Sequence, residues 1–372
     1  MKDPRLVQLA EQLVDYSIGL KSGEKIYLEI KGIEALELGK ELVRVSAERG
    51  GVPFWYYNDE TLSRGFIMNA GEKQFEAWGQ FHKKIMAEVD AYIAVRGSTN
   101  PYDLADVDAD RMKWFNKAYW DEVHSLRVAE KRWCVLRYPN PSMAILGEKS
   151  TEKFEEFYFN VCTLDYAKMS KAMDPLVALL EKTDRVEIKG PGTDLRFSIK
   201  GIGAVKCDGH RNIPDGEVYS CPVRDSMNGV ITYNAASMRN GMLFRDVRFD
   251  VKDGKIIDAS CTGDNQRLKE ILDTDEGARY FGEFAFGVNP YITEPMLDTL
   301  FDEKIGGSFH LTPGKAYEKT NNGNHSAVHW DLVSIQTEAK GGGEILFDGK
   351  RVRKDGLFVV PELAGLNPDA LK

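Results

Sequence analysis

The segment KIYLEIKGIEALELGKELVRVSAERGGVPFWYYN, residues 25 to 58, decides how the first half of the chain folds. Its two ends, KIYLEI and VPFWYYN, have the aliphatic and aromatic composition of strands, and the stretch between them has the spacing of a helix that ends at glycines. The runs DAYIAVRG (90–97) and RWCVLRYP (132–139) are two further strands of this kind. Strands separated by helices indicate parallel crossovers, so we predict a layered α/β region with a mostly parallel sheet.

The pattern changes beyond about residue 185, where DRVEIKG, TDLRFSIKG and GVITYNA alternate apolar and polar residues and break at Gly, Asp and Asn. This alternation is typical of hairpins in an antiparallel sheet. A chain of 372 residues is also long enough for two domains. We therefore predict an N-terminal α/β domain at residues 1–186 and an α+β domain rich in antiparallel strands at residues 187–372.

Composition excludes several classes of protein. The net charge is −9 and the basic residues form no stripe, so nucleic acid is not an expected partner. The start of the chain has no uninterrupted apolar stretch, so we expect neither a signal peptide nor a membrane span. Neither glycine-rich phosphate-binding pattern is present, which argues against a nucleotide. The odd number of widely spaced cysteines predicts reduced thiols and a cytoplasmic protein: Cys134, Cys162, Cys207, Cys221 and Cys261.

The stretch HSAVHWDLVSI, residues 325 to 335, contains two of the six histidines. We predict a strand here, on which His329 and Asp331 point the same way while His325 lies in the preceding turn. An imidazole and a carboxylate about 7 Å apart along one strand face can bind one cation or two adjacent cations. The alternative for this pair is a solvated edge strand. His82 and His124 lie in charge-rich helical stretches and are predicted at the surface.

Other acidic and histidine side chains of the second half have unusual surroundings. Glu283 lies in the apolar run FGEFAFG, on a predicted helix, and a carboxylate in such surroundings needs a positive partner. A metal ion and Arg279 are the two candidates for that partner. Glu217 follows a Pro and Gly turn at the start of a strand, and His310 lies on a predicted short strand after two glycines.

Five of these motifs occur in the order found in the M29 family of metallo-aminopeptidases, the aminopeptidase T and aminopeptidase S group. They are PDGEVY (214–219), TDEGARYFGE (274–283), LFDE (300–303), FHLTPGKAY (309–317) and NHSAVHWD (324–331). The chain resembles that family over essentially its whole length. Each motif alone is weak, but five in order are specific.

The resemblance implies a peptidase that removes N-terminal residues, with residues 187–372 as its metal-binding catalytic domain. Two divalent ions (Zn, Co or Mn) would be held by Glu217, Glu283, His310, His329 and Asp331, with Glu303 as a sixth ligand. Tyr317 corresponds to a tyrosine that acts near the reacting carbonyl, and Glu217 and Glu283 would share in catalysis by holding the ions that activate a bridging water. The family also implies a homodimer and peptide substrates with a free N-terminus.

Other functions remain open at this stage. A mononuclear non-heme iron ring-cleaving dioxygenase on the same scaffold needs only two histidines and one carboxylate. The surplus of acidic candidates favours the two-metal hydrolase. A metal-binding protein without activity is a third class, and a serine hydrolase is weaker, because GGSFH does not match the GxSxG turn that exposes a nucleophilic serine.

Overall fold

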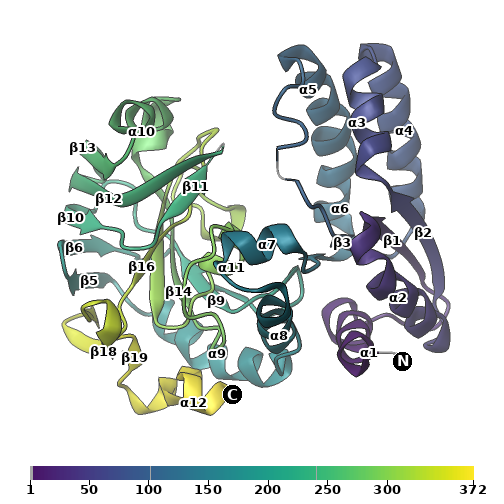
Figure 1. Cartoon of the computed structure of the whole chain (residues 1–372). Coiled ribbons are helices and arrows are strands. Elements are labelled where there is room, and N and C mark those ends of the chain that lie inside the picture. Colours follow the sequence, from purple (N-terminus) through teal and green to yellow (C-terminus); the bar gives the residue numbers. More distant parts are fainter. Residues whose placement is uncertain (1–2, 101, 240) are drawn as a thin grey trace. The chain divides into compact units, whose positions relative to one another are not determined.

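A computed structural model describes residues 3–100, 102–239 and 241–372 (Figure 1). Its contacts divide the chain into two compact units. The first is Met1–Thr163 with Gly209–Ile213, and the second is Leu164–Asp208 with Pro214–Lys372. This division assigns helix α9 (Tyr166–Leu180) to the second unit, whereas the sequence pattern puts the boundary after residue 186. The domain boundary at that position stays a prediction.

The first unit contains the predicted parallel sheet. Its strands follow the order β2-β1-β3-β4-β8, and every neighbouring pair is parallel. The chain therefore adds β2 on one side of β1 and then β3 and β4 on the other side. The strand order reverses at β1. The predicted α/β class is confirmed. The strands are β1 (Lys25–Lys31), β2 (Val52–Asn58), β3 (Ala91–Arg96), β4 (Arg132–Arg137) and β8 (Asn212–Ile213).

Most helices of this unit lie between its strands in the chain, as crossovers between parallel strands require. Several begin at residues that accept hydrogen bonds from the first turn; Asp59, for example, accepts from Thr61 N at the start of α3. The helices are α1 (Pro4–Glu11), α2 (Leu36–Glu48), α3 (Glu60–Asn69), α4 (Glu72–Glu88), α5 (Ala109–Asn116), α6 (Ser125–Glu130), α7 (Pro141–Leu146) and α8 (Thr151–Cys162). Irregular helical turns occupy Gln12–Ile18 and Lys117–His124.

The prediction of surface positions for His82 and His124 is wrong. Both are half-buried, because the ring of His82 lies 4.2 Å from that of Trp78 and the ring of His124 lies 4.4 Å from that of Trp120. Burial lowers the pKa of both, to about 4 for His124. The charged residues around them in the sequence had suggested solvent exposure.

The second unit contains a nine-stranded and a five-stranded sheet, both antiparallel as predicted. The larger sheet has the order β11-β12-β10-β6-β5-β17-β18-β19, with β13 paired to β12. Its strands are β5 (Arg185–Gly190), β6 (Thr193–Ser198), β10 (Asn228–Thr232), β11 (Ser237–Arg239), β12 (Met242–Lys252), β13 (Lys255–Thr262), β17 (Glu344–Phe347), β18 (Lys350–Lys354) and β19 (Leu357–Phe358).

The five-stranded sheet has the order β16-β15-β14-β9-β7. It consists of β7 (Val205–Cys207), β9 (Glu217–Ser220), β14 (Phe281–Gly287), β15 (Ser308–Pro313) and β16 (Leu332–Ile335). Short helices α10 (Asn265–Leu272), α11 (Thr299–Asp302) and α12 (Pro368–Leu371) complete the unit. In the described part of the chain, no helix combines the length and apolarity that crossing a membrane requires.

One face of the five-stranded sheet packs on the larger sheet. Phe284 and Phe286 of β14 point into this layer, where the ring of Phe284 lies 5.1 Å from that of Phe197 on β6 and that of Phe286 lies 6.0 Å from that of Phe347 on β17. Side chains alternate along a strand, so Glu283 and Ala285 point to the opposite face. The aromatic layer therefore fixes which face carries the acidic residues.

Phe284→Ala tests the role of this layer. Phe284 is fully buried, and the loss of its ring is expected to cost about 3–5 kcal/mol of unfolding free energy. The denaturation midpoint of the second unit should fall, and metal affinity should fall with it because Glu283 lies on the same strand. Ile257→Ala, at an exposed position in the same unit, should leave the midpoint nearly unchanged. Equal midpoints for the two variants would contradict the assignment.

Candidate metal centre

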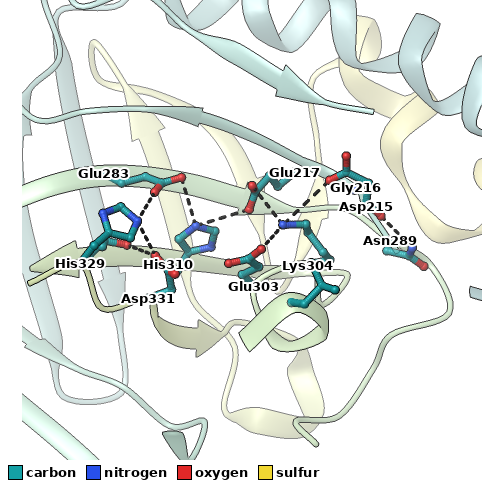
Figure 2. A network of polar contacts seen from close by, with 12 residues as sticks. Asp215, Gly216, Glu217, Glu283, Asn289, Glu303, Lys304, His310, His329 and Asp331 are labelled. Carbon is teal, nitrogen blue, oxygen red and sulfur yellow. Dashed lines mark hydrogen bonds and ion pairs between the residues drawn. The ribbon is translucent and has the colours of Figure 1, made fainter. Parts of the chain in front are cut away.

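Three adjacent strands and the segment before β16 place acidic and imidazole side chains on one face of the five-stranded sheet. In the strand register, His310 on β15 is opposite Ala285, and Glu217 on β9 is opposite Gly287. These pairs lie on the Glu283 side of β14, because Glu283, Ala285 and Gly287 share one parity. Directly opposed side chains are about 5 Å apart, so residues distant in the sequence converge here (Figure 2).

The first cluster consists of Glu217, Glu283 and His310, which are all buried. His310 Nε2 lies 3.5 Å from Glu217 Oε2 and 3.5 Å from Glu283 Oε1. One imidazole nitrogen therefore faces two carboxylates. The candidate ligand atoms of all three residues lie within 4.8 Å of one another, which suits a single cation.

The second cluster consists of Glu283, His329 and Asp331. His329 Nε2 lies 3.2 Å from Glu283 Oε2 and 3.3 Å from Asp331 Oδ1. Glu283 thus presents one carboxylate oxygen to each cluster, as Figure 2 shows. A carboxylate placed in this way can bridge two cations.

Neighbouring groups hold the side chains of the second cluster in place. His329 Nδ1 lies 2.8 Å from the Lys315 carbonyl oxygen, so an Nδ1–H donor leaves the Nε2 lone pair directed at the cluster. Thr312 Oγ1 donates to Asp331 Oδ1 at 2.7 Å. Arg239 donates to the carbonyl oxygen of His329 at 2.9 Å, which fixes the backbone.

The pKa shifts in the two clusters show that the carboxylates stabilise positive charge on the neighbouring histidines. Burial alone would lower the pKa of His310, but hydrogen bonding to Glu283 and the charge of Glu217 raise it to about 9. The pKa of His329 rises to about 11 against the effect of burial, chiefly through Asp331. The same contacts lower the pKa values of Glu283 and Asp331, although burial opposes the change.

The donor set fits divalent metal ions. It consists of carboxylate oxygens and imidazole nitrogens without a thiolate, which suits Zn, Co or Mn. Glu217 Oε2 and His329 Nε2 are buried and have no hydrogen-bond partner among the described residues, so both atoms have free lone pairs for a ligand. A buried carboxylate oxygen without a hydrogen bond is costly, and a bound cation would remove that cost.

Lys304 is a buried cation beside the first cluster. Its side chain is 1% exposed, and its Nζ lies 3.1 Å from Glu217 Oε1 and 3.9 Å from Asp215 Oδ1, and contacts Glu303 as well. These carboxylates raise the pKa of Lys304 against the effect of burial. Cys207 forms a third group with Asp215 and Glu217, and burial raises the pKa of its thiol.

Glu303 and Tyr317 lie at the edge of the clusters. Glu303 lines a small cavity together with Asp331. Among the described residues, it belongs to neither of the two clusters that share Glu283. The ring centroid of Tyr317 lies 4.7 Å from that of His329, and the side chain remains partly exposed to solvent. Desolvation and the charge of Glu283 raise the pKa of Tyr317, so the hydroxyl stays a proton donor.

The local prediction for Glu283 is wrong, because this residue lies on strand β14 and not on a helix. A strand buried on both faces has no apolar and polar alternation, so periodicity cannot distinguish it from a helix. Arg279, the alternative partner of Glu283, instead contacts Asp273 at 2.7 Å. The positive partners of Glu283 are His310 and His329.

The predicted strand around His329 is only partly correct. Regular pairing begins at Leu332, and His329 makes an isolated bridge to Gly314. His329 and Asp331 nevertheless reach the same cluster, while His325 is exposed outside it. Lys304 has no distinguishing signal in the sequence, because a lysine beside a glutamate is ordinary on a protein surface. Only the apolar residues near LFDEK signalled that this segment is buried.

Comparisons with known proteins extend over almost the whole chain. The model of the family described as thermophilic metalloprotease (M29) matches residues 2–353. Aminopeptidase 2 of Geobacillus stearothermophilus is 26% identical, with 95% of each chain covered. Aminopeptidase T of Thermus thermophilus is 25% identical, with 95% of this chain and 98% of the relative covered.

Two solved structures share the fold. Wild-type AmpT from Thermus thermophilus superposes with a TM-score of 0.79 at 24% identity, over 96% of this chain and 99% of that one. The 2,5-dihydroxypyridine dioxygenase of Pseudomonas putida KT2440 superposes with a TM-score of 0.64 at 12% identity, over 98% and 99%. At these identities the superpositions establish the fold alone. The family match confirms the resemblance carried by the five motifs, and the chain belongs to the thermophilic metalloprotease (M29) family.

Proposed function

We propose that this chain is a two-metal aminopeptidase that hydrolyses the first peptide bond of peptides. The observation that carries the proposal is the pair of three-residue clusters that share Glu283. Membership of a metalloprotease family and full-length relatives named aminopeptidases support it.

In this proposal Glu217, Glu283 and His310 hold one ion, and Glu283, His329 and Asp331 hold the other. The ions are Zn, Co or Mn. When bound, two such ions activate a water molecule and polarise the scissile carbonyl group. Glu217 and Glu283 serve catalysis by fixing the positions of both ions.

The charge balance of the buried site supports two ions. Lys304 compensates one of the carboxylates in the group Asp215, Glu217, Glu283, Glu303 and Asp331. Burial raises the pKa of Glu303, so this group is counted as protonated and three carboxylates remain; two divalent ions with one hydroxide would balance these three when both histidines are neutral ligands. With a single ion, an excess of buried negative charge would remain, at a cost of several kcal/mol for each unpaired group.

The other side chains of the site bind and orient the substrate. Tyr317 donates its hydroxyl proton in a hydrogen bond to the oxyanion that forms at the attacked carbonyl. Glu303 carries a proton between the attacking water and the leaving amine.

The assembly and location of the enzyme are also proposals. We propose a homodimer, as the family resemblance implies. The five free cysteines support a cytoplasmic location, where thiols stay reduced.

Metal analysis tests the ligand set. Purified protein reconstituted with Zn, Co or Mn should contain two equivalents of metal per chain and hydrolyse aminoacyl p-nitroanilides. His329→Ala should lose at least one equivalent of metal and almost all activity, because it removes the imidazole that would bind the same ion as Asp331. His325→Ala, an exposed histidine four residues earlier, should retain both.

Full activity of His329→Ala after chelation would refute the metal centre. The same preparations loaded with Fe(II) should consume no oxygen with dihydroxylated aromatic compounds. Oxygen uptake without peptide hydrolysis would favour the mononuclear dioxygenase instead.

Tyr317→Phe separates binding from transition-state stabilisation. Removal of one oxyanion donor is expected to lower kcat by about 10²–10³, with a smaller effect on KM. The metal content should stay at the wild-type value, because the phenol is not a proposed ligand. Unchanged kcat would exclude Tyr317 from the reaction, and loss of metal would show that it is a ligand.

Glu303→Gln decides between the predicted ligand role of this residue and proton transfer. As a proton carrier, Glu303 should be needed for rate and not for metal, so kcat should fall by about 10²–10⁴ with both equivalents of metal retained. Loss of one equivalent would identify a ligand. Glu276→Gln, whose side chain is 87% exposed, is the matched control and should retain wild-type activity.

A further inference from the structure

The first unit contains a large cavity that the proposed chemistry does not use. Its volume is about 570 Å³, within the range of small-molecule sites. It lies where the parallel strands end: Lys31 closes β1, Asn58 closes β2, and Arg96 closes β3, and all three line it. The strand order β2-β1-β3 reverses at β1. Open parallel sheets bind ligands at the carboxyl ends of the strands, beside such a reversal.

Arg127 is a buried cation in the wall of this cavity. It is 3% exposed, and its guanidinium lies between two rings, 4.8 Å from the centroid of Tyr92 and 5.1 Å from that of Trp133. Its Nε is buried without an acceptor, and no carboxylate pairs with it among the described residues. A guanidinium held in this way is available to an anion.

Arg96 lines the same cavity and likewise has no ion pair with a described carboxylate. Other cations of the wall differ, because Lys31 lies 3.6 Å from Glu60 and Arg64 lies 2.7 Å from Asp106. Arg96 and Arg127 are therefore two arginines of the wall that have no carboxylate partner among the described residues. Arginine is the residue suited to bidentate binding of a carboxylate.

Glu29 supplies the opposite charge. It lies on β1, lines the cavity and accepts a hydrogen bond from Tyr92 Oη, and in the described part of the chain no basic side chain lies within ion-pair distance of it. A cavity with an unpaired carboxylate and two unpaired guanidinium groups is complementary to a zwitterion.

One part of the wall is aromatic. The ring of Trp78 lies 5.9 Å from that of Phe115 and 6.2 Å from that of Phe66, and all three residues line the cavity. Such a surface favours a planar apolar group. The absence of glycine-rich phosphate loops argues against a nucleotide.

We propose that this cavity is a second binding site, for a free aromatic amino acid or a short peptide that carries one. Arg96 and Arg127 bind its carboxylate, Glu29 binds its ammonium group, and the aromatic wall around Trp78 contacts its ring. The site lies in a different unit from the metal centre, and the inference does not depend on peptidase activity.

Calorimetric titration of the full-length, metal-loaded protein tests the site. The probes are L-phenylalanine, 3-phenylpropanoate, which lacks the ammonium group, and phenethylamine, which lacks the carboxylate. L-phenylalanine should bind with a stoichiometry of one to a Glu283→Gln variant, in which the metal centre is disabled. Binding that disappears with Glu283→Gln, or equal affinity for all three probes, would overturn the proposal.

Substitutions locate the bound ligand. Arg127→Gln and Arg96→Gln should each weaken binding of L-phenylalanine about tenfold or more, because each removes a charged hydrogen bond. Glu29→Gln should weaken L-phenylalanine and leave 3-phenylpropanoate unchanged. Arg49→Gln, which changes an arginine paired with Asp15 away from the cavity, should have no effect.

Circular dichroism checks that each variant folds. If Arg127→Gln does not, Arg96→Gln decides, since Arg96 is at a strand end and only partly buried. Wild-type affinity in a folded Arg96→Gln variant would refute the site, as would the absence of L-phenylalanine binding to the wild-type protein.

Discussion

The structure of the second unit depends on a concentration of buried negative charge on one face of a sheet. Glu217 and Glu283 come from adjacent strands, and His310 faces both from the next strand. Like charges at this spacing repel, and burial increases the repulsion because the interior screens poorly. The chain retains the arrangement because the opposite face of the same sheet is packed with aromatic rings. Positive charge on Lys304 and on the two histidines offsets this repulsion.

Much of this could be predicted from sequence, for identifiable reasons. The parallel sheet followed from strands and helices that alternate within short distances, a signal that local patterns carry well. The acidic and histidine residues that cluster in the structure lie in motifs whose fixed order pointed to them. Glu283 was placed on the wrong element because a strand buried on both faces has no alternation. His329 lies ahead of the regular strand because its position is set by a bridge to Gly314 and by the Lys315 carbonyl, and neither is local in sequence.

Features that depend on convergence of distant segments were beyond prediction. Lys304 reads as a surface residue until the fold places it beside Glu217, 87 positions earlier in the chain. Likewise, Arg127 is ordinary in sequence and becomes an unpaired buried cation only when α6 packs it between Tyr92 and Trp133. In both cases the sequence shows that the residue is charged. Its burial and its neighbours depend on tertiary packing.

The geometry of the second cluster is set by close backbone contacts more than by side-chain packing. Gly314 has φ +108, and a Cβ at this position would lie 2.0 Å from the Val328 carbonyl oxygen. A Cβ on Gly282 would lie 2.2 Å from the Lys315 carbonyl oxygen, which is the atom that orients His329. Only glycine lets these segments approach so closely. Gly282 and Gly314 therefore matter to the two clusters as much as the acidic and imidazole side chains do, because they fix the separation between the carboxylate of Glu283 and the imidazole of His329.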